Sequence, residues 1–178
     1  MKYFKKIAGE RLYLSPICTD DFEIYTKWLN DYDVAAGIGQ YPKMIGIGGE
    51  KKILERLAAD EQCYAMVLYE TDELIGNIGL HNIDDISRSA EIGLFIGEAA
   101  NRGKGYGAEA LGLMLNFAFE SLNLRNVMLQ LNSDNERAFA CYRKTGFREI
   151  GRRRSAKFKD GKYIDVIYMD IVKDEFRK

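Results

Sequence analysis

The sequence predicts an α+β fold in which helices pack against a single mixed β-sheet. Segments with helical or strand-like apolar spacing follow the order strand, two helices, three strands, helix, strand, helix, two strands, whereas a doubly wound fold would alternate the two more regularly. The chain has 178 residues, of which 47% are hydrophobic and 30% charged, a size and composition typical of one domain with a sizeable core. We therefore expect a single domain over residues 1–178.

The N-terminal third is expected to hold one strand and two helices. Residues 11–17 alternate apolar and polar side chains, as a half-buried strand does. Thr19 precedes two aspartates, so it is predicted to cap a helix that ends near Asn30. The glycine-rich stretch 37–49 is expected to be irregular, and residues 50–59 carry apolar side chains at the spacing of a second, short helix.

The remaining elements follow from apolar spacing and turn residues. Ser133 to Glu136 form a capping-box pattern that opens the last helix, and Gly146 supplies its stop. Asp160-Gly161 is a hairpin signal between the last two strands. In chain order the other expected strands are 63–69, 74–80, 90–96, 127–131, 147–154 and 163–172, with a helix over 109–122.

The segment from Arg102 to Ala108 lies between a strand-like run and a helix-like run. Its three glycines alternate along the chain, and glycine permits backbone conformations that turn successive N–H groups toward one anion. The N-terminus of the following helix adds partial positive charge. We therefore interpret the segment as a cradle for a pyrophosphate. The alternative is that the glycines serve only a tight turn between strand and helix.

Two other phosphate-binding motifs have to be compared with this segment. Gly103, Gly105 and Ala108 match the GxGxxA form of the dinucleotide fingerprint. In a dinucleotide-binding fold the fingerprint follows its strand directly, and an acidic residue stands about 20 positions later at the end of the next strand. In this chain residues 97–101 separate the strand from the glycines, and the next strand ends with Asn132, which is not acidic. A P-loop is excluded, because the chain contains no GK[ST] sequence.

Two signatures in the chain resemble those of a known family. Arg102-x-x-Gly105-x-Gly107 resembles the Q/R-x-x-G-x-G/A signature of the GNAT superfamily of acetyl-CoA-dependent N-acetyltransferases, and Asn135 followed by Tyr142 resembles its second signature. The order of elements over residues 10–172 matches as well, and the stretch Trp28-Leu29-Asn30-Asp31 is similar to the branch with ribosomal-protein, polyamine and aminoglycoside acetyltransferases. The resemblance implies a mixed, mostly antiparallel sheet of about seven strands flanked by four helices and splayed at its central parallel pair.

The resemblance also implies the cofactor and its site. Acetyl-CoA is the expected cosubstrate, with no metal, and its pantetheine arm is expected to pair with the backbone of Phe95, Ile96 and Gly97. The pyrophosphate is expected to lie on main-chain N–H groups, with added charge from an arginine and a lysine. The implied loop residues are Arg102, Gly103, Lys104, Gly105, Tyr106, Gly107 and Ala108, joined by Asn135 near the cofactor sulfur.

Acetyl transfer to an amine requires a neutral nucleophile, a donor for the developing oxyanion, and a proton for the departing thiolate. Tyr142 is the candidate for the last role, because positions 135 and 142 share one helix face. The ordinary pKa of tyrosine, about 10, exceeds that of a thiol, about 8.5, so complete proton transfer is uphill by roughly 2 kcal/mol. Tyr142 could instead donate a hydrogen bond to the sulfur without giving up its proton. The other interpretation is that Tyr142 is a structural residue of the core.

Glu91 is the candidate base for the amine, because some members of the resembled family carry a base in this strand. On the neighbouring strand, Gln130 stands where other members place a glutamate, and an amide cannot act as a base. A primary amine can also lose its proton to solvent before it binds. Both routes are compatible with direct attack of the amine on the thioester in a ternary complex.

The charge pattern favours a small anionic ligand. Residues 102–159 hold 12 Lys and Arg against 5 Asp and Glu, within a net charge of −1. This distribution suits a nucleotide and argues against a nucleic-acid partner. A helix needs about 18 consecutive apolar residues to span a bilayer, and no apolar run in the sequence is that long. We therefore expect a cytoplasmic protein with no membrane partner. Three scattered cysteines without a CxxC pair predict neither a disulfide framework nor a zinc site.

The leading functional hypothesis is therefore an acetyl-CoA-dependent N-acetyltransferase, a monomer or a homodimer. Its acceptor is a small-molecule amine or a protein N-terminus. A non-catalytic acyl-CoA-binding sensor could use the same loop and is the alternative. An NAD(P)-dependent oxidoreductase is the third hypothesis.

Overall fold

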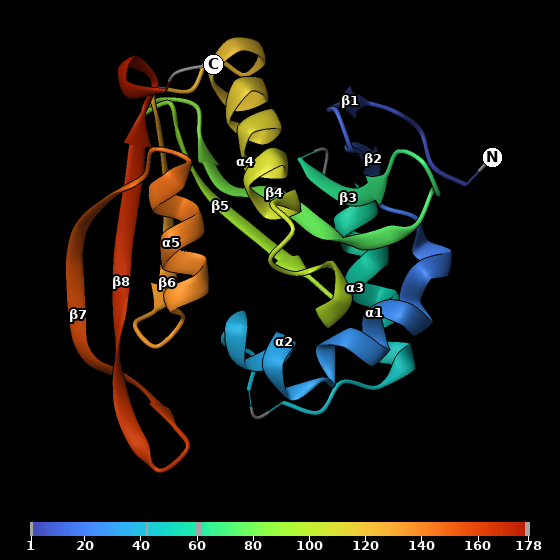
Figure 1. Ribbon diagram of the computed structural model, residues 1–178, viewed down its shortest axis with the longest axis horizontal. Helices are drawn as coiled ribbons and strands as arrows, with labels where there is room; N and C mark the ends of the chain where they lie inside the picture. Colours follow the sequence, from blue (N-terminus) through green and yellow to red (C-terminus); the bar gives the residue numbers. More distant parts are fainter. Residues whose placement is uncertain (1, 42, 60–61, 177–178) are drawn as a thin grey trace. The chain divides into compact units, whose positions relative to one another are not determined.

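The computed structural model describes residues 2–41, 43–59 and 62–176. Its strands follow the hydrogen-bonded order β1-β2-β3-β4-β5-β6-β8-β7, and Figure 1 traces them along the chain. The strands are β1 Ile7–Ala8, β2 Leu12–Pro16, β3 Cys63–Leu68, β4 Leu74–Asp84, β5 Ser89–Ile96, β6 Asn126–Asn132, β7 Arg148–Lys159 and β8 Lys162–Val172. The helices are α1 Phe22–Leu29, α2 Tyr32–Gly37, α3 Ile47–Ala59, α4 Tyr106–Asn116 and α5 Glu136–Lys144.

The chain folds into two compact units. The first combines Met1–Gly79 with Leu94–Leu113, and the second combines Leu80–Gly93 with Met114–Lys178. Strands β4 and β5 and helix α4 contribute residues to both units. The single domain expected over residues 1–178 stays a prediction.

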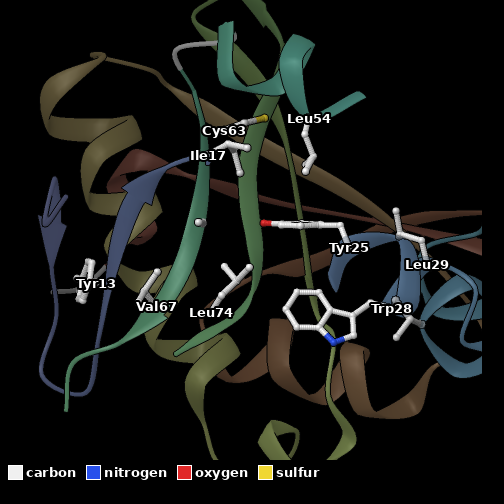
Figure 2. Packing of buried hydrophobic residues seen from close by; sticks show 11 residues of the cluster. Tyr13, Ile17, Tyr25, Trp28, Leu29, Leu54, Cys63, Val67 and Leu74 are labelled. Carbon is white, nitrogen blue, oxygen red and sulfur yellow. The ribbon is translucent and has the colours of Figure 1, made fainter. Parts of the chain in front are cut away.

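The core of the first unit lies where α1, α2 and α3 meet one face of β2, β3 and β4. Alternate residues of β3 face this core, since side chains of a strand point to opposite faces in turn. Figure 2 shows Tyr25 and Trp28 of α1 and Leu54 of α3 directed toward the strands. The ring centroids of Tyr25 and Trp28 lie 5.4 Å apart, and Phe95 of β5 lies 6.2 Å from Trp28. These edge-to-face contacts add to the burial of large apolar side chains.

The second unit is built on β6, β8 and β7. β6 pairs antiparallel with β8, and β8 with β7. The β7–β8 hairpin, orange to red in Figure 1, closes through Asp160 and Gly161, with φ values of 50° and 80°. Two successive positive φ values are typical of a type I′ hairpin turn, so the Asp-Gly prediction is confirmed. The predicted stop of the last helix at Gly146 is confirmed too, because this residue has a φ of +100°.

One pair of neighbouring strands is parallel, and it is splayed. β5 pairs with β6 from Ser89 to Glu91 only, opposite Asn126 to Met128. Ile92 and Gly93 continue β5 within the second unit but have no pairing partner on β6. The predicted fold class, a mixed and mostly antiparallel sheet that opens at its parallel pair, is confirmed.

The structure adds one strand and one helix to the predicted set. Strand β1 has only two residues and is defined by pairing with Tyr13 and Leu14 of β2, which no local pattern reveals. Helix α2 opens at Asp31, whose side chain accepts a hydrogen bond from the Val34 N–H at 3.1 Å. The first helix does end at Leu29, as expected. Helix α3 starts at Ile47, inside the stretch expected to be irregular.

Two predicted helix caps are wrong, and one helix changes its type before it ends. Thr19 lies inside a short 3₁₀ turn, Thr19–Asp21, that has no side-chain cap. Helix α5 is capped by Asn135 instead of Ser133, because the Asn135 Oδ1 accepts from the Ala138 N–H at 3.1 Å. The Ser133 hydroxyl accepts from the Asp165 N–H of β8. The helix expected over 109–122 begins earlier, at Tyr106, and is α-helical as α4 to Asn116; a π-helical turn, Phe117–Ser121, continues it to its C-cap at Leu122.

Within the described ranges, no helix is both long enough and apolar enough to cross a membrane.

Candidate active site

The glycine-rich loop lies in the first unit, between β5 and α4. Gly103 and Gly105 have φ values of +76° and +88°, a left-handed conformation that residues with a Cβ atom avoid. Such alternation turns consecutive N–H groups toward one side. The Glu109 N–H donates to the Gly105 carbonyl at 3.1 Å as the helix begins. The N–H groups of residues 106–108 precede the first intrahelical bond and are therefore available to an anion.

The Arg102 side chain lies against the end of β5. It is 11% exposed, its Nε donates to the Ile96 carbonyl at 3.1 Å, and its Nη2 donates to the Gly97 carbonyl. Its guanidinium is also 3.9 Å from carboxylate oxygens of Asp31 and Asp33. The charge expected from Arg102 is thus held at the start of the loop, where it joins β5 to α2. Its role toward a phosphate stays a prediction.

Gly97 lies in close contact with α1. A Cβ atom at this position would lie 2.0 Å from Cδ2 of Trp28. The Trp28 Nε1 donates to Glu98 at 3.0 Å, and Lys27 forms an ion pair with the same carboxylate. The Gly97 N–H donates to the Ile75 carbonyl at 2.9 Å. These contacts fix the end of β5, the segment whose backbone was expected to bind the pantetheine arm.

A second set of contacts, which the sequence analysis missed, lies behind the loop. The Glu109 carboxylate accepts the backbone N–H groups of Glu10 and Arg11 at 2.9 and 2.8 Å, and the Arg11 Nε at 2.8 Å. Burial opposes ionisation of Glu109, but these hydrogen bonds outweigh it and hold the pKa of the carboxyl below its usual value. Arg11 and Glu109 are 98 positions apart. The only local signal was an acidic residue in the first turn of a helix.

Tyr142 lies in the second unit, on α5, and is 8% exposed. Its ring packs against Phe147 with centroids 5.7 Å apart. In the described part of the chain, its hydroxyl forms no hydrogen bond with another protein group. Burial raises the pKa of Tyr142 well above its ordinary value, with a smaller contribution from the neighbouring Cys141. The phenol therefore keeps its proton at physiological pH.

The other two residues expected near the thioester are also in the second unit. Asn135 uses its Oδ1 to cap α5, which leaves its amide N–H groups for other partners. Glu91 lies on β5 opposite Met128 and is half-buried. Gln130 lies on β6 opposite Tyr168 and is exposed.

The structure thus divides the predicted site residues between the two units. The cofactor-loop residues, from Phe95 to Ala108, belong to the first, and Glu91, Asn135 and Tyr142 belong to the second. Among the described residues, no group of three or more His, Cys, Asp or Glu side chains is arranged to hold a metal ion.

A mixed sheet that opens at one parallel pair, with a glycine-rich loop and then a helix after the first strand of that pair, defines the class of α+β protein to which this fold belongs. A model of the acetyltransferase (GNAT) domain family matches residues 11–148, which is most of the chain. The chain therefore belongs to the GNAT acetyltransferase family and is an acyltransferase of the N-acetyltransferase type. The family expected from the two signatures is confirmed.

Individual relatives are distant in sequence but close in fold. The N-acetyltransferase 9-like protein of Caenorhabditis briggsae is 24% identical over 157 residues, which cover 82% of this chain and 78% of that protein. The crystal structure of a GNAT-family acetyltransferase from Bacillus anthracis has a TM-score of 0.84 at 21% identity and covers 95% of this chain and 99% of its own. Spermidine N-acetyltransferase from Vibrio cholerae, solved in complex with CoA and spermine, has a TM-score of 0.83 at 24% identity, with 94% and 98% coverage.

Proposed function

We propose that the chain transfers the acetyl group of acetyl-CoA to a primary amine by direct attack on the thioester in a ternary complex. The observation that carries this proposal is the loop before α4, with left-handed Gly103 and Gly105 and the open N–H groups of residues 106–108. It is the arrangement that a diphosphate needs. Membership of the GNAT acetyltransferase family supports acetyl-CoA as the donor.

In this proposal each part of the loop has its own role. The main-chain N–H groups from Gly103 to Ala108 hold the pyrophosphate, and the exposed Lys104 adds charge. The backbone of Phe95, Ile96 and Gly97 orients the pantetheine arm, and Arg102 fixes that backbone through the Ile96 and Gly97 carbonyls. Acetyl-CoA supplies the activated acyl group, and no metal takes part.

Tyr142 acts as the donor to the departing sulfur. Its pKa is raised by burial, so complete transfer of the phenolic proton to a thiolate is even less favourable than for an ordinary tyrosine. We infer that Tyr142 stabilises the thiolate chiefly by a hydrogen bond, as an oxyanion-hole donor stabilises an oxyanion. Asn135 supports this role, because it fixes the first turn of α5.

The amine has to arrive without its proton, or lose it at the site. Deprotonation of a lysine-like amine at pH 7 costs about 4.6 kcal/mol. Glu91 is the carboxylate that we assign to this step, directly or through a water molecule. An amine whose pKa is already near neutrality would not need it.

The acceptor is a small-molecule amine or a protein N-terminus. Polyamines are the first small amines to test, because the Vibrio cholerae enzyme with the same fold is a spermidine N-acetyltransferase. We further propose that the protein acts in the cytoplasm, as a monomer or a homodimer.

Release of free thiol from acetyl-CoA, followed over a panel of polyamines, aminoglycosides, amino acids and N-terminal peptides, tests the proposal. We expect amine-dependent release with at least one acceptor class. Binding of CoA in calorimetry without thiol release from any amine would indicate an acyl-CoA sensor instead. Stabilisation by NAD(P) with no response to CoA would favour the dinucleotide hypothesis.

A further inference from the structure

The Arg11 side chain contacts the back of the glycine-rich loop at several successive positions. Its Nη1 donates to the Lys104 carbonyl at 2.9 Å, and its guanidinium carbon lies 5.0 Å from the centre of the Tyr106 ring. A Cβ atom on Gly105 would be 3.2 Å from the Arg11 Nη2. The guanidinium is therefore packed directly against the segment that the proposed function assigns to the pyrophosphate.

Glu109 holds Arg11 in this position. Its Oε2 accepts from the Arg11 Nε at 2.8 Å, while its Oε1 accepts backbone N–H groups of the turn between β1 and β2. Gly9 of that turn is so close that a Cβ atom there would lie 2.7 Å from the Glu109 Oε1. The carboxylate is 14% exposed at the first turn of α4, where a negative charge is also favoured by the helix dipole.

Among the described residues, the centre of the loop has few other contacts, in contrast to Arg102 at its start. Gly103, Lys104 and Gly105 are exposed, and a Cβ atom on Gly103 would meet nothing within 4 Å. The Lys104 carbonyl accepts from Arg11, and the Gly105 carbonyl accepts from the Glu109 N–H at 3.1 Å. The Lys104 carbonyl is thus oriented by the Arg11 side chain, and the Gly105 carbonyl by the first backbone hydrogen bond of α4.

The direction of the Lys104 carbonyl determines where the next N–H group points. In a trans peptide, the C=O of one residue and the N–H of the next point in opposite directions. Because Arg11 holds the Lys104 carbonyl, the Gly105 N–H is directed to the opposite side of the chain, which is the side available to an anion.

We propose that Arg11 and Glu109 are positioning residues, which together preset the loop for the diphosphate of CoA. This inference rests on the proposed function. A preset loop binds more tightly because less conformational freedom is lost on binding. The two residues do not have to touch the cofactor, and the arginine acts through its fork of donors as well as its charge.

Calorimetry with free CoA on the full chain tests this role, with Arg11→Gln, Arg11→Lys and Glu109→Gln as variants. We expect Arg11→Gln and Glu109→Gln to raise the Kd for CoA about tenfold, the loss that one well-placed hydrogen bond produces. Arg11→Lys should bind about as weakly, since a lysine cannot bond Lys104 and Glu109 with one planar group. The matched control is Arg125→Gln, which removes a two-pronged surface pair with Asp174 in the second unit and should leave the Kd unchanged.

Hydrogen exchange without ligand gives a readout that does not depend on binding. The Glu109 amide, which donates to the Gly105 carbonyl in the wild type, should exchange faster in Arg11→Gln than in the wild type or in Arg125→Gln. An unchanged Kd and unchanged exchange of the Glu109 amide in a folded Arg11→Gln variant would overturn the positioning role and leave the proposed function intact. Full rescue by Arg11→Lys would overturn it too, because charge alone would then suffice. A wild-type chain that binds no CoA would remove the proposed function, and this inference with it.

Discussion

At the scale of single residues, the aromatic side chains Trp28 and Tyr142 each constrain one feature of the protein. Trp28 lies directly over Gly97, and its ring leaves no room for even one methyl group there. Tyr142 has an apolar surrounding that keeps its phenol protonated, and its hydroxyl is unused by the described part of the protein. The first residue fixes a backbone position, and the second offers a proton donor.

Gly97→Ala is expected to destabilise the protein. The added Cβ would lie within 2.0 to 2.5 Å of three atoms of the buried Trp28 ring, and overpacking of this kind costs about 2 to 3 kcal/mol. Urea unfolding followed by tryptophan fluorescence measures the change. Gly112→Ala in α4 is the matched control, because a Cβ there meets nothing within 4 Å and should add up to about 1 kcal/mol of helix stability. Equal unfolding midpoints for the two variants would contradict the close contact.

Tyr142→Phe is expected to lower kcat by about 100-fold, because the departing thiolate loses its donor. The midpoint of thermal unfolding should not fall, since the hydroxyl has no partner in the described chain. Steady-state thiol release and calorimetry with CoA together separate turnover from affinity, which should be retained. Tyr163→Phe, at a tyrosine that is 68% exposed on β8, is the control. Normal turnover in Tyr142→Phe would make Tyr142 a structural residue.

At the scale of elements, the start of α5 depends on a side chain that the sequence analysis had assigned to the cofactor. Asn135 caps the helix, while Ser133 accepts a hydrogen bond from β8. The helix carries Tyr142 about two turns later, so the cap also determines where the phenol lies. A single asparagine thereby links helix stability to the position of the proposed donor.

Asn135→Ala should therefore lower the free energy of unfolding by about 1 kcal/mol, the usual cost of losing an N-cap. Asn135→Ser retains a capping oxygen and should restore most of that loss. Denaturant unfolding of the three proteins gives the comparison. If Asn135→Ala were as stable as the wild type, the capping hydrogen bond would not contribute.

At the scale of the whole molecule, Glu50 and Glu109 give the stability of the protein opposite dependences on pH. Glu50 of α3 is 1% exposed, and one of its carboxylate oxygens has no hydrogen-bond partner among the described residues. Burial raises the pKa of Glu50, whereas the contacts with the turn between β1 and β2 lower that of Glu109. Folding therefore favours the protonated form of the first and the ionised form of the second.

Glu50→Gln should raise the thermal midpoint at pH 7, because the folded state no longer has to hold a buried charge. The stability that wild-type Glu50 provides when protonated is complete below the unfolded pKa of about 4.3 and is lost as the pH rises through its raised folded pKa. The difference between variant and wild type should therefore shrink toward pH 4. Differential scanning fluorimetry across this range measures it. A variant less stable than the wild type at pH 7 would show that the carboxylate is stabilised in place.

Glu109→Gln should show the reverse. Its lowered pKa contributes stability that is present above about pH 4.3 and is lost as the pH falls through the folded pKa. The variant should have a lower midpoint than the wild type at pH 7, and the gap should close on acidification. A gap independent of pH would mean that the ionised form of Glu109 is not the one preferred by the fold.

Local features of the sequence were sufficient for the parts of the protein whose conformation is set locally. Gly103 and Gly105 of the loop, Gly146 after α5 and the Asp160-Gly161 turn have positive φ values, whereas Gly107, the third glycine of the predicted loop, lies in α4. Gly105 also belongs to the first of the two family signatures. Apolar spacing located most strands to within a few residues, because most strands bury one face.

The tertiary structure decided what depends on partners far away in the chain. The two-residue strand β1 exists only through β2, the Arg102 side chain is turned toward β5 and α2, and Arg11 meets Glu109 across 98 positions. Hydrogen bonds between distant segments produce no periodic pattern in the sequence. The sequence also does not indicate whether a charged side chain faces solvent or a backbone carbonyl. The sequence alone thus determined the family and the loop, and only the folded chain revealed which side chains hold that loop in place.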